Sequence, residues 1–460
     1  MRLSGLRRAS FLVVAAAACA VFTGSTARGH DPAFDDEPPP RVLDAVLYRP
    51  SAMPDRVVLS WTGDAATTRA VTWRTSTDVE RAYAQIAPAD AGPRFKEQAR
   101  RLDAVTHAFK SDLSKCHVHA VEFKDLQPAT KYAYRVGDGV NFSEWFQFRT
   151  AAVSPEPFSF VYFGDAQNDI RSMWSRVIRE AWSDVPRAAF MLHAGDLVTT
   201  AESDAQWGEW FSAGGWLNGM IPVVATPGNH EYLSVKQPDG SKTVRLSRHW
   251  TAQFTFPANG PPGLEETAYY LDYHDLRVIS LNSNERQEEQ AAWLDKVLAA
   301  SDRTWTVITF HHPIFSVAKE RDNPSLRNVW KPTFDRHPVD LVLNGHDHTY
   351  GRTGPIGPEA NVSTGTSWRS GSAGTVYVVS VSGPKMYEVE RNPRAELRRV
   401  AEDTQLYQII SIDGPVLRYE ARTAIGDVYD AFTLKKRPGA PNEMIEQVPS
   451  VPERRRKPAE

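Results

Sequence analysis

The chain has 460 residues, of which 41% are apolar, so it is long enough for a large buried core and too long for one ordinary domain. Charged residues make up 24%, the formal net charge is -3, and no basic stretch is interleaved with aromatic residues, which argues against a nucleic-acid partner. The two cysteines, Cys19 and Cys116, cannot dominate a metal site, so any metal must be held by His, Asp and Asn side chains.

The first residues predict an export signal. Basic residues at Arg2, Arg7 and Arg8 precede a continuous apolar run at 11–22, and small residues at 25–27 offer a cleavage site. The apolar run is too short for a permanent membrane span. We therefore expect 1–27 to be a signal peptide, 28–44 to be a Pro-rich linker, and the mature protein to be exported, to the periplasm or outside the cell.

Residues 45–151 show the pattern of a β-sandwich. Short strand-like runs, such as Val57–Trp61 and Tyr132–Val136, are separated by turn residues, and several of the runs in this region alternate with a period of two. The stretch Leu126–Tyr132 has the spacing of a tyrosine corner. This region resembles a fibronectin type III module, an all-β sandwich.

The pattern changes in residues 152–434. Apolar strands are predicted at 158–163, 188–192, 221–225, 305–310 and 339–343, with helices at 171–182, 207–217 and 285–300 between them. Such alternation predicts a mainly parallel sheet packed between helices, and the strand-rich stretch 374–434 predicts a mixed sheet that closes the domain. The tail 435–460 lacks a hydrophobic period, so we expect it to be disordered.

Five short motifs follow predicted strands, at the sheet edge where open α/β folds place their ligands. They are Gly164-Asp165-Ala166-Gln167, Gly195-Asp196, Gly228-Asn229-His230-Glu231, His311-His312-Pro313 and Gly345-His346-Asp347-His348. Their carboxylate, amide and imidazole groups suit divalent metals, and their glycines allow tight turns. Two metal ions close together neutralise a phosphate ester and activate water, so the pattern indicates phosphoester chemistry.

In this order the motifs resemble those of the calcineurin-like metallophosphoesterases. The preceding sandwich and the run Gly345–Tyr350 narrow the resemblance to the purple acid phosphatases, over about 45–434. The resemblance implies a fibronectin type III-like sandwich followed by an α/β domain of mixed β-sheets sandwiched by helices. It also implies two metal ions. The implied ligands are Asp165 and His348 for the first metal, Asp196 as the bridge, and Asn229, His311 and His346 for the second.

The implied activity is hydrolysis of small phosphate monoesters by attack of a metal-bound hydroxide. Asp196 would bridge the metals, Asn229 would hold the phosphate, and His230 would protonate the leaving group. A phosphodiesterase on the same metal pair is one alternative. A non-catalytic surface-binding protein with a decayed site is the other. No sequence feature points to a particular oligomeric state.

Two positions depart from the family pattern. Thr199 stands where purple acid phosphatases have the tyrosine that binds ferric iron, and Gln167 stands where the wider family has a histidine. We therefore expect two divalent ions (Mn, Fe or Zn) rather than a purple ferric centre. Either the carbonyl oxygen of Gln167 or a water molecule would fill the remaining position of the first metal.

Some of these residues also have structural interpretations. Asp165, Asp196 and Asn229 could each be turn formers or helix N-caps, although independent caps need not alternate with paired histidines. His193 and His312 are expected to be packed, or to support the ligands without binding metal. Tyr350 and Arg352 could shape the phosphate pocket or stabilise a loop.

Overall fold

The computed structural model describes residues 41–237, 239–358, 370–371, 373–447 and 449–456. The predicted signal peptide and almost all of the predicted linker therefore lie outside the described residues. The described residues from Asp44 onward belong to one compact unit, which contains all the elements below. Among the described residues, no helix has both the length and the apolar character that a membrane crossing requires.

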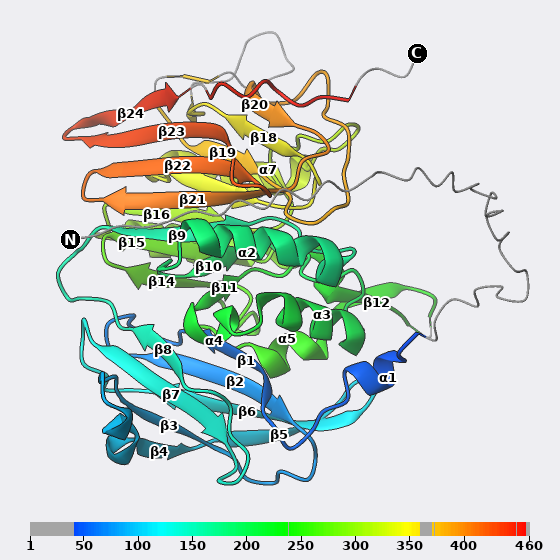
Figure 1. Cartoon of the computed structure of the whole chain (residues 1–460). Helices are drawn as coiled ribbons and strands as arrows, with labels where there is room; N and C mark the ends of the chain where they lie inside the picture. The colour runs from blue at the N-terminus through cyan, green and yellow to red at the C-terminus, as the bar shows by residue number, and fades with distance from the viewer. Residues whose placement is uncertain (1–40, 238, 359–369, 372, 448, 457–460) are drawn as a thin grey trace, which may run out of the picture. The chain divides into compact units, whose positions relative to one another are not determined.

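Two four-stranded antiparallel sheets form the N-terminal β-rich domain, which follows a short helix, α1 (Asp44–Leu47) (Figure 1). One sheet has the order β1 (Asp55–Ser60), β2 (Arg69–Thr75), β6 (Lys115–Phe123), β5 (Val105–Lys110). The other has the order β4 (Arg100–Asp103), β3 (Tyr83–Pro88), β7 (Lys131–Gly137), β8 (Phe146–Arg149). The Tyr132 hydroxyl accepts a hydrogen bond from the Gln127 N–H at 2.8 Å, which is the contact that the tyrosine-corner spacing predicts.

The α/β part of the chain begins with a seven-stranded mixed sheet. Three short parallel strands, β11 (Val223–Ala225), β10 (Met191–His193) and β9 (Phe158–Phe163), form one side of it. The antiparallel strands β21 (Leu406–Asp413), β22 (Val416–Thr423), β23 (Val428–Arg437) and β24 (Ala440–Gln447) continue the sheet from β9. A π-helical turn (Ile170–Trp174) and α2 (Ser175–Asp184) connect β9 to β10 along the chain. The helices α3 (Asp204–Gly214) and α4 (Leu217–Met220) connect β10 to β11 (Figure 1).

A second seven-stranded mixed sheet has the order β14-β15-β16-β17-β19-β18-β20. Its strands are β14 (Tyr269–Tyr273), β15 (Leu276–Ser280), β16 (Trp305–Thr309), β17 (Leu341–Asn344), β18 (Tyr350–Thr353), β19 (Val376–Val379) and β20 (Leu397–Ala401). Along the chain, α6 (Gln287–Ala299) connects β15 to β16, and α7 (Pro324–Arg336) connects β16 to β17. A short helix, α5 (Arg248–Gln253), and a hairpin of β12 (Tyr232–Lys236) and β13 (Lys242–Leu246) complete the domain.

The alternation of side chains along the second sheet explains the layers. Val307 and Leu341 belong to the core that also contains the first sheet, whereas their neighbours Ile308 and Val342 belong to a second core with Leu294 of α6 and Trp330 of α7. Because successive strand residues point to opposite faces, one face packs on the first sheet and the other on helices. The predicted fold class, a sandwich followed by mixed sheets between helices, is confirmed.

The prediction of a disordered tail is wrong for residues 435–447. β23 extends to Arg437, and β24 (Ala440–Gln447) pairs with it in antiparallel register, for example Leu434 with Met444. The strand is mostly exposed, so its sequence has no clear hydrophobic period. It is held instead by backbone hydrogen bonds to the edge of β23, which require no side-chain pattern.

Candidate metal centre

The six predicted ligands all follow strands, and the fold brings them together. Asp165, Asp196 and Asn229 follow the parallel strands β9, β10 and β11 of the first sheet. His311 follows β16 of the second sheet, and the pair His346 and His348 follows β17. Since the carboxyl ends of these strands meet at one edge of the two-sheet core, side chains from five loops converge there.

The loops turn tightly because two glycines leave room for the carboxylates. A Cβ atom at Gly345 would lie 2.2 Å from Asp165 Oδ1, and one at Gly228 would lie 2.1 Å from Asp196 Oδ1. Asp196, His346 and His348 themselves adopt positive φ values of 51°, 75° and 48°. Non-glycine residues in this region are strained, and such strain is concentrated at functional sites.

Asp165, Asp196 and His348 form a first buried group whose ligand atoms lie within 4.8 Å of one another. His348 Nδ1 pairs with the Lys385 carbonyl at 3.0 Å, which requires the proton on Nδ1 and leaves a lone pair on Nε2. That lone pair faces Asp165 Oδ2 at 3.2 Å. Asp165 Oδ2 has no hydrogen-bond donor among the described residues, so two acceptors face each other without a positive charge between them.

The second group repeats this arrangement around His311. Its Nδ1–H donates to the Ala194 carbonyl at 2.9 Å, so Nε2 is the ring nitrogen that faces the site. Around Nε2 lie Asp196 Oδ2 at 3.1 Å, Asn229 Oδ1 at 3.1 Å and His346 Nδ1 at 3.2 Å. Carboxylate, amide oxygen and imidazole acceptors that converge in this way fit a divalent cation.

His312 lies closer to this group than its sequence interpretation implied. Its ring nitrogen falls within 4.8 Å of the ligand atoms of His311 and His346, and its ring centroid is 4.2 Å from that of His346. His312 Nδ1 pairs with Ser283 Oγ at 2.8 Å. The hydroxyl therefore orients the ring beside the cluster, which agrees with a supporting role.

The ionisation of the site favours metal binding. Burial lowers the pKa of His348 to about 3, and burial together with the charge of His311 lowers the pKa of His346 far below its ordinary value. Both imidazoles are therefore neutral near pH 7, as ligation requires. Burial, aided by the charge of Asp196, raises the pKa of Asp165 to about 7. A cation would replace the proton on this carboxyl group.

Asp196 and His311 form the most strongly coupled pair. Burial opposes ionisation of Asp196, but the charge and hydrogen bond of His311 lower its pKa well below the ordinary value. Burial alone would lower the pKa of His311, whereas Asp196 and Asp165 raise it to about 9. The Asp196 carboxylate is therefore ionised near pH 7, and His311 is protonated.

Gln167 and Thr199 occupy the two positions that depart from the family pattern. Gln167 Nε2 lies 2.8 Å from Asp196 Oδ2 and 3.1 Å from His348 Nε2, and its Oε1 is buried without a partner among the described residues. Rotation of this amide would turn its oxygen toward the same two ligands. Thr199 Oγ1 instead accepts a hydrogen bond from the Asn168 N–H at 3.2 Å, so its hydroxyl is engaged outside the cluster.

Glu231 is a residue of this centre that the sequence analysis did not single out. Its buried carboxylate accepts hydrogen bonds from the backbone N–H groups of Asp196, Leu197 and Gly228 at 2.8, 2.8 and 2.7 Å. These contacts tie the loop after β10 to the loop after β11. An acidic residue directly after Asn229 and His230 was the only sequence signal, and nothing in the sequence showed which amides it would meet.

Three other residues that the sequence singled out make structural contacts. The buried Tyr350 hydroxyl donates to Asp430 at 2.6 Å, and Arg352 forms an ion pair with the same carboxylate at 2.6 Å, which favours the structural interpretation of both. His193 is buried beside Trp174 and Trp210, with ring centroids 5.9 and 5.4 Å away, in agreement with a packed histidine.

Comparison with known proteins points to one family. Residues 54–150 match the purple acid phosphatase N-terminal domain, and residues 158–350 match the calcineurin-like phosphoesterases. An uncharacterized protein of Mycobacterium tuberculosis strain H37Rv is 26% identical over 333 residues. That alignment covers 64% of this chain and 61% of the relative, so the chain spans less than two thirds of that protein's length.

Two further relatives carry the family name. Purple acid phosphatase 21 of Arabidopsis thaliana is 28% identical over 333 residues, which cover 69% of this chain and 71% of the relative. The solved purple acid phosphatase PPD1 of yellow lupin shares the fold, with a TM-score of 0.68 at 18% identity over 84% of this chain and 74% of that chain. The chain belongs to the calcineurin-like phosphoesterases of the purple acid phosphatase type, with the N-terminal domain of that family.

Proposed function

We propose that the chain hydrolyses phosphate monoesters with two divalent metal ions. The observation that carries this proposal is the convergence of His311 Nε2, Asp196 Oδ2 and Asn229 Oδ1 at 3.1 Å, together with the partnerless Asp165 Oδ2 that faces His348. The first ion would be held by Asp165, Asp196 and His348. The second would be held by Asp196, Asn229, His311 and His346. The metal pair, when bound, neutralises the phosphate and lowers the pKa of water toward about 7.

We infer that His230 supplies the proton for the leaving group. Its Nδ1–H donates to the Thr199 carbonyl at 2.6 Å, which turns Nε2 toward the site, 4.0 Å from Asp196 Oδ2. Its side chain is 29% exposed, so it borders the open face of the cluster. Asn229 directs Oδ1 toward His311 and keeps its amide N–H groups free to hold a phosphate oxygen.

A divalent pair is proposed because the ferric ligand of the purple enzymes has no counterpart here. A threonine hydroxyl cannot replace a phenolate as a charge-transfer ligand, and that of Thr199 is already bonded to the Asn168 N–H. Mn, Fe(II) or Zn fits the nitrogen and oxygen donors. Elemental analysis of the purified protein identifies the metals, and a purple absorption band would contradict a divalent pair.

The central test is Asp196→Ala. We expect this variant to lose turnover of p-nitrophenyl phosphate and to retain less metal, because the carboxylate that serves both metals is removed. Asp413→Ala, at the exposed last residue of β21, is the matched control and should retain both properties. Full activity of Asp196→Ala would refute the proposal. Faster turnover of bis(p-nitrophenyl) phosphate than of the monoester would favour a phosphodiesterase.

Export of the protein is also proposed, on the basis of the basic start, the apolar run at 11–22 and the small residues at 25–27. The N-terminal sequence of the protein recovered outside the cytoplasm should begin at Arg28. Recovery of protein that still begins at Met1 would contradict a cleaved signal.

A further inference from the structure

Two basic side chains lie against one aromatic ring at the edge of the metal-ligand cluster. The guanidinium carbon of Arg321 is 4.7 Å from the ring centroid of Tyr387, and the ammonium nitrogen of Lys385 is 5.4 Å from it. The Tyr387 ring is in turn 4.8 Å from the ring of His348. Cation–π contacts of this kind hold the two positive charges near the ring.

Backbone contacts anchor these residues to the ligands of both proposed metals. Arg321 donates to the carbonyl of His346 at 3.0 Å, and the Lys385 carbonyl pairs with His348 Nδ1 at 3.0 Å. Tyr387 N–H donates to the His348 carbonyl at 3.0 Å. Arg321 thus approaches His346 from its backbone side. The two cations therefore lie next to the loop that carries His346 and His348.

The positive charges are incompletely neutralised. Arg321 is 3.7 Å from the buried carboxylate of Asp347, which already accepts a hydrogen bond from the Val317 N–H at 2.6 Å. The Arg321 side chain is 32% exposed, and among the described residues its only hydrogen bond is the one to His346. Lys385 has no carboxylate partner in the described part of the chain. Both can therefore bind an anion from solution.

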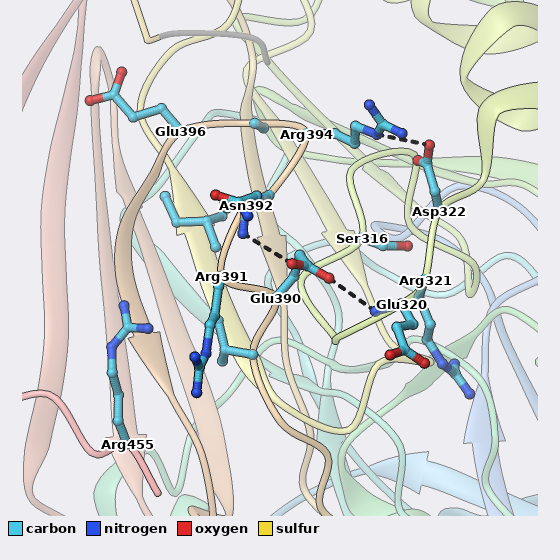
Figure 2. Close-up of a pocket in the computed structure, with 14 residues that line it drawn as sticks. Ser316, Glu320, Arg321, Asp322, Glu390, Arg391, Asn392, Arg394, Glu396 and Arg455 are labelled. Atoms are coloured by element: carbon cyan, nitrogen blue, oxygen red, sulfur yellow. Dashed lines mark hydrogen bonds and ion pairs between the residues drawn. The ribbon is translucent and has the colours of Figure 1, made fainter. Parts of the chain in front are cut away.

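A large cavity beside this edge has a different character. It has a volume of about 1110 Å³ and is lined by Arg391, Arg394 and Glu390 among others, but by none of the six proposed metal ligands. Its carboxylates are engaged, as Figure 2 shows for Asp322 with Arg394 at 3.3 Å and for Glu390 with the Glu320 N–H at 3.0 Å. Arg321 also lines this cavity, but its side chain lies apart from those of Arg391 and Arg394 (Figure 2) and donates to the His346 carbonyl at the cluster edge.

We propose that Arg321 and Lys385 bind a second anionic group on the leaving group, so that the protein prefers phosphate monoesters of anionic alcohols. This inference rests on the proposed phosphatase function. In the reaction, the oxygen of water forms a bond to phosphorus, the ester P–O bond breaks, and the anionic alcohol leaves after its oxygen takes up a proton. The two cations hold the remote anion throughout, so their contribution is to substrate binding and is expressed mainly in KM.

The test compares two substrates that differ only in the charge of the leaving group. Glycerol 3-phosphate releases a neutral alcohol, whereas 3-phosphoglycerate releases an alcohol with a carboxylate. The wild type should have the higher kcat/KM for 3-phosphoglycerate. Arg321→Gln and Lys385→Gln should each lower the ratio of the two kcat/KM values by about five- to tenfold, mainly through KM, because one charge-assisted contact is lost.

Matched charge changes in the same loop serve as controls. Lys319→Gln removes a cation whose ammonium is already paired with Glu388 at 3.2 Å, so the ratio should stay within about twofold. Glu320→Gln removes a neighbouring carboxylate and should leave the ratio unchanged or raise it. Arg321→Lys keeps a charge and should restore part of the preference.

The outcomes separate the two proposals. If the wild type hydrolyses none of glycerol 3-phosphate, 3-phosphoglycerate and p-nitrophenyl phosphate, the proposed phosphatase function is wrong. If it hydrolyses both substrates but the ratio is the same in wild type, Arg321→Gln and Lys385→Gln, only the assignment of these two cations is overturned. A fall of equal size in Lys319→Gln would also overturn it, because the effect would then be one of general surface charge.

Discussion

The position of the Asp196 carboxylate depends on a strained backbone that its neighbours hold in place. Asp196 has a φ of 51°, in the left-handed region that costs a non-glycine residue on the order of 1–2 kcal/mol. The Glu231 carboxylate accepts from the Asp196 N–H at 2.8 Å, and the His230 N–H donates to Asp196 Oδ1 at 2.9 Å. These charge-assisted contacts offset the strain and aim Oδ2 at His311.

Gly228→Ala tests how tightly this carboxylate is confined. The new methyl group would lie 2.1 Å from Asp196 Oδ1 and 2.5 Å from the Asp196 nitrogen, so the carboxylate must move. We expect loss of turnover and of bound metal with little change in the far-ultraviolet circular dichroism spectrum. Gly63→Ala is the control, since its Cβ would meet Thr68 at an ordinary 3.6 Å. Wild-type activity in Gly228→Ala would show that Asp196 tolerates displacement.

The ends of β9, β10, β11, β16 and β17 determine which side chains can meet. Each strand is short, three to six residues. At most two residues separate the end of each strand from the motif that follows it. Parallel pairing keeps the carboxyl ends of neighbouring strands at one edge. The site is therefore a property of strand register, because a slip of one residue would turn a ligand to the opposite face.

The helix α3 connects the catalytic part to the N-terminal domain through a buried ion-pair network. Asp204, the first residue of α3, accepts from Arg56 at 2.8 Å and from Arg74 at 3.2 Å, and all three side chains are at most 4% exposed. Burial disfavours charged side chains, but guanidinium groups stay charged inside a protein. The Asp204 carboxylate is therefore required to neutralise the two arginines.

Asp204→Asn should therefore destabilise the protein strongly. The change leaves the buried Arg56 guanidinium without its ion-pair partner and leaves Arg74 with only the partly exposed Asp55, so we expect a loss of about 3–5 kcal/mol in the free energy of unfolding in urea. Asp55→Asn is the control, because Asp55 also pairs with Arg74 but is 41% exposed, and it should cost only about 0–1 kcal/mol. Equal losses in the two variants would contradict the importance of burial at Asp204.

The N-terminal domain and the catalytic part share a continuous core. Val58 and Trp61 of the first domain pack in the same apolar cluster as Phe160 and Phe190, and the Tyr134 hydroxyl donates to the Gly219 carbonyl at 2.6 Å. A core that continues across both parts favours cooperative unfolding. The N-terminal domain thus supports the catalytic fold directly.

Buried neutral histidines make the whole molecule sensitive to acid. His119 is fully buried between Thr75 and Thr106, and burial, aided by the charge of His117, lowers its pKa from 6.5 to about 4. The unfolded chain therefore binds a proton that the folded chain excludes, and stability falls as the pH drops from about 6.5 to about 4. The loss approaches 3 kcal/mol, on the order expected for such a shift.

His119→Gln should make the fall in Tm between pH 6.5 and 4 shallower than in the wild type, because glutamine does not take up a proton. His107→Gln, at an exposed position of the neighbouring β5, should leave the slope unchanged. Thermal unfolding at several pH values measures both. An identical slope in His119→Gln and wild type would show that other groups control the acid sensitivity.

Much of the architecture and the ligand set could be predicted from residues that are close in sequence. Strands with buried alternation and helices with a periodic apolar face carry their own signals, and motifs such as Gly345–His348 combine a turn with several metal donors. The convergence of six ligands was predictable because parallel strands end at a common edge. The substitution at Thr199 is likewise visible in the sequence, since it depends only on its spacing from Asp196.

The remaining features depend on contacts between segments far apart in the chain. The pairing of β24, the approach of Glu231 to the Asp196 amide, the bond of Tyr350 to Asp430 and the position of Arg321 beside His346 all join distant loops. None has a local pattern, because a hydrogen bond or ion pair needs only that two groups meet at the right distance. Local composition therefore decides which elements form and which donors they carry, whereas tertiary packing decides which of those donors are held, neutralised or left free to bind a substrate.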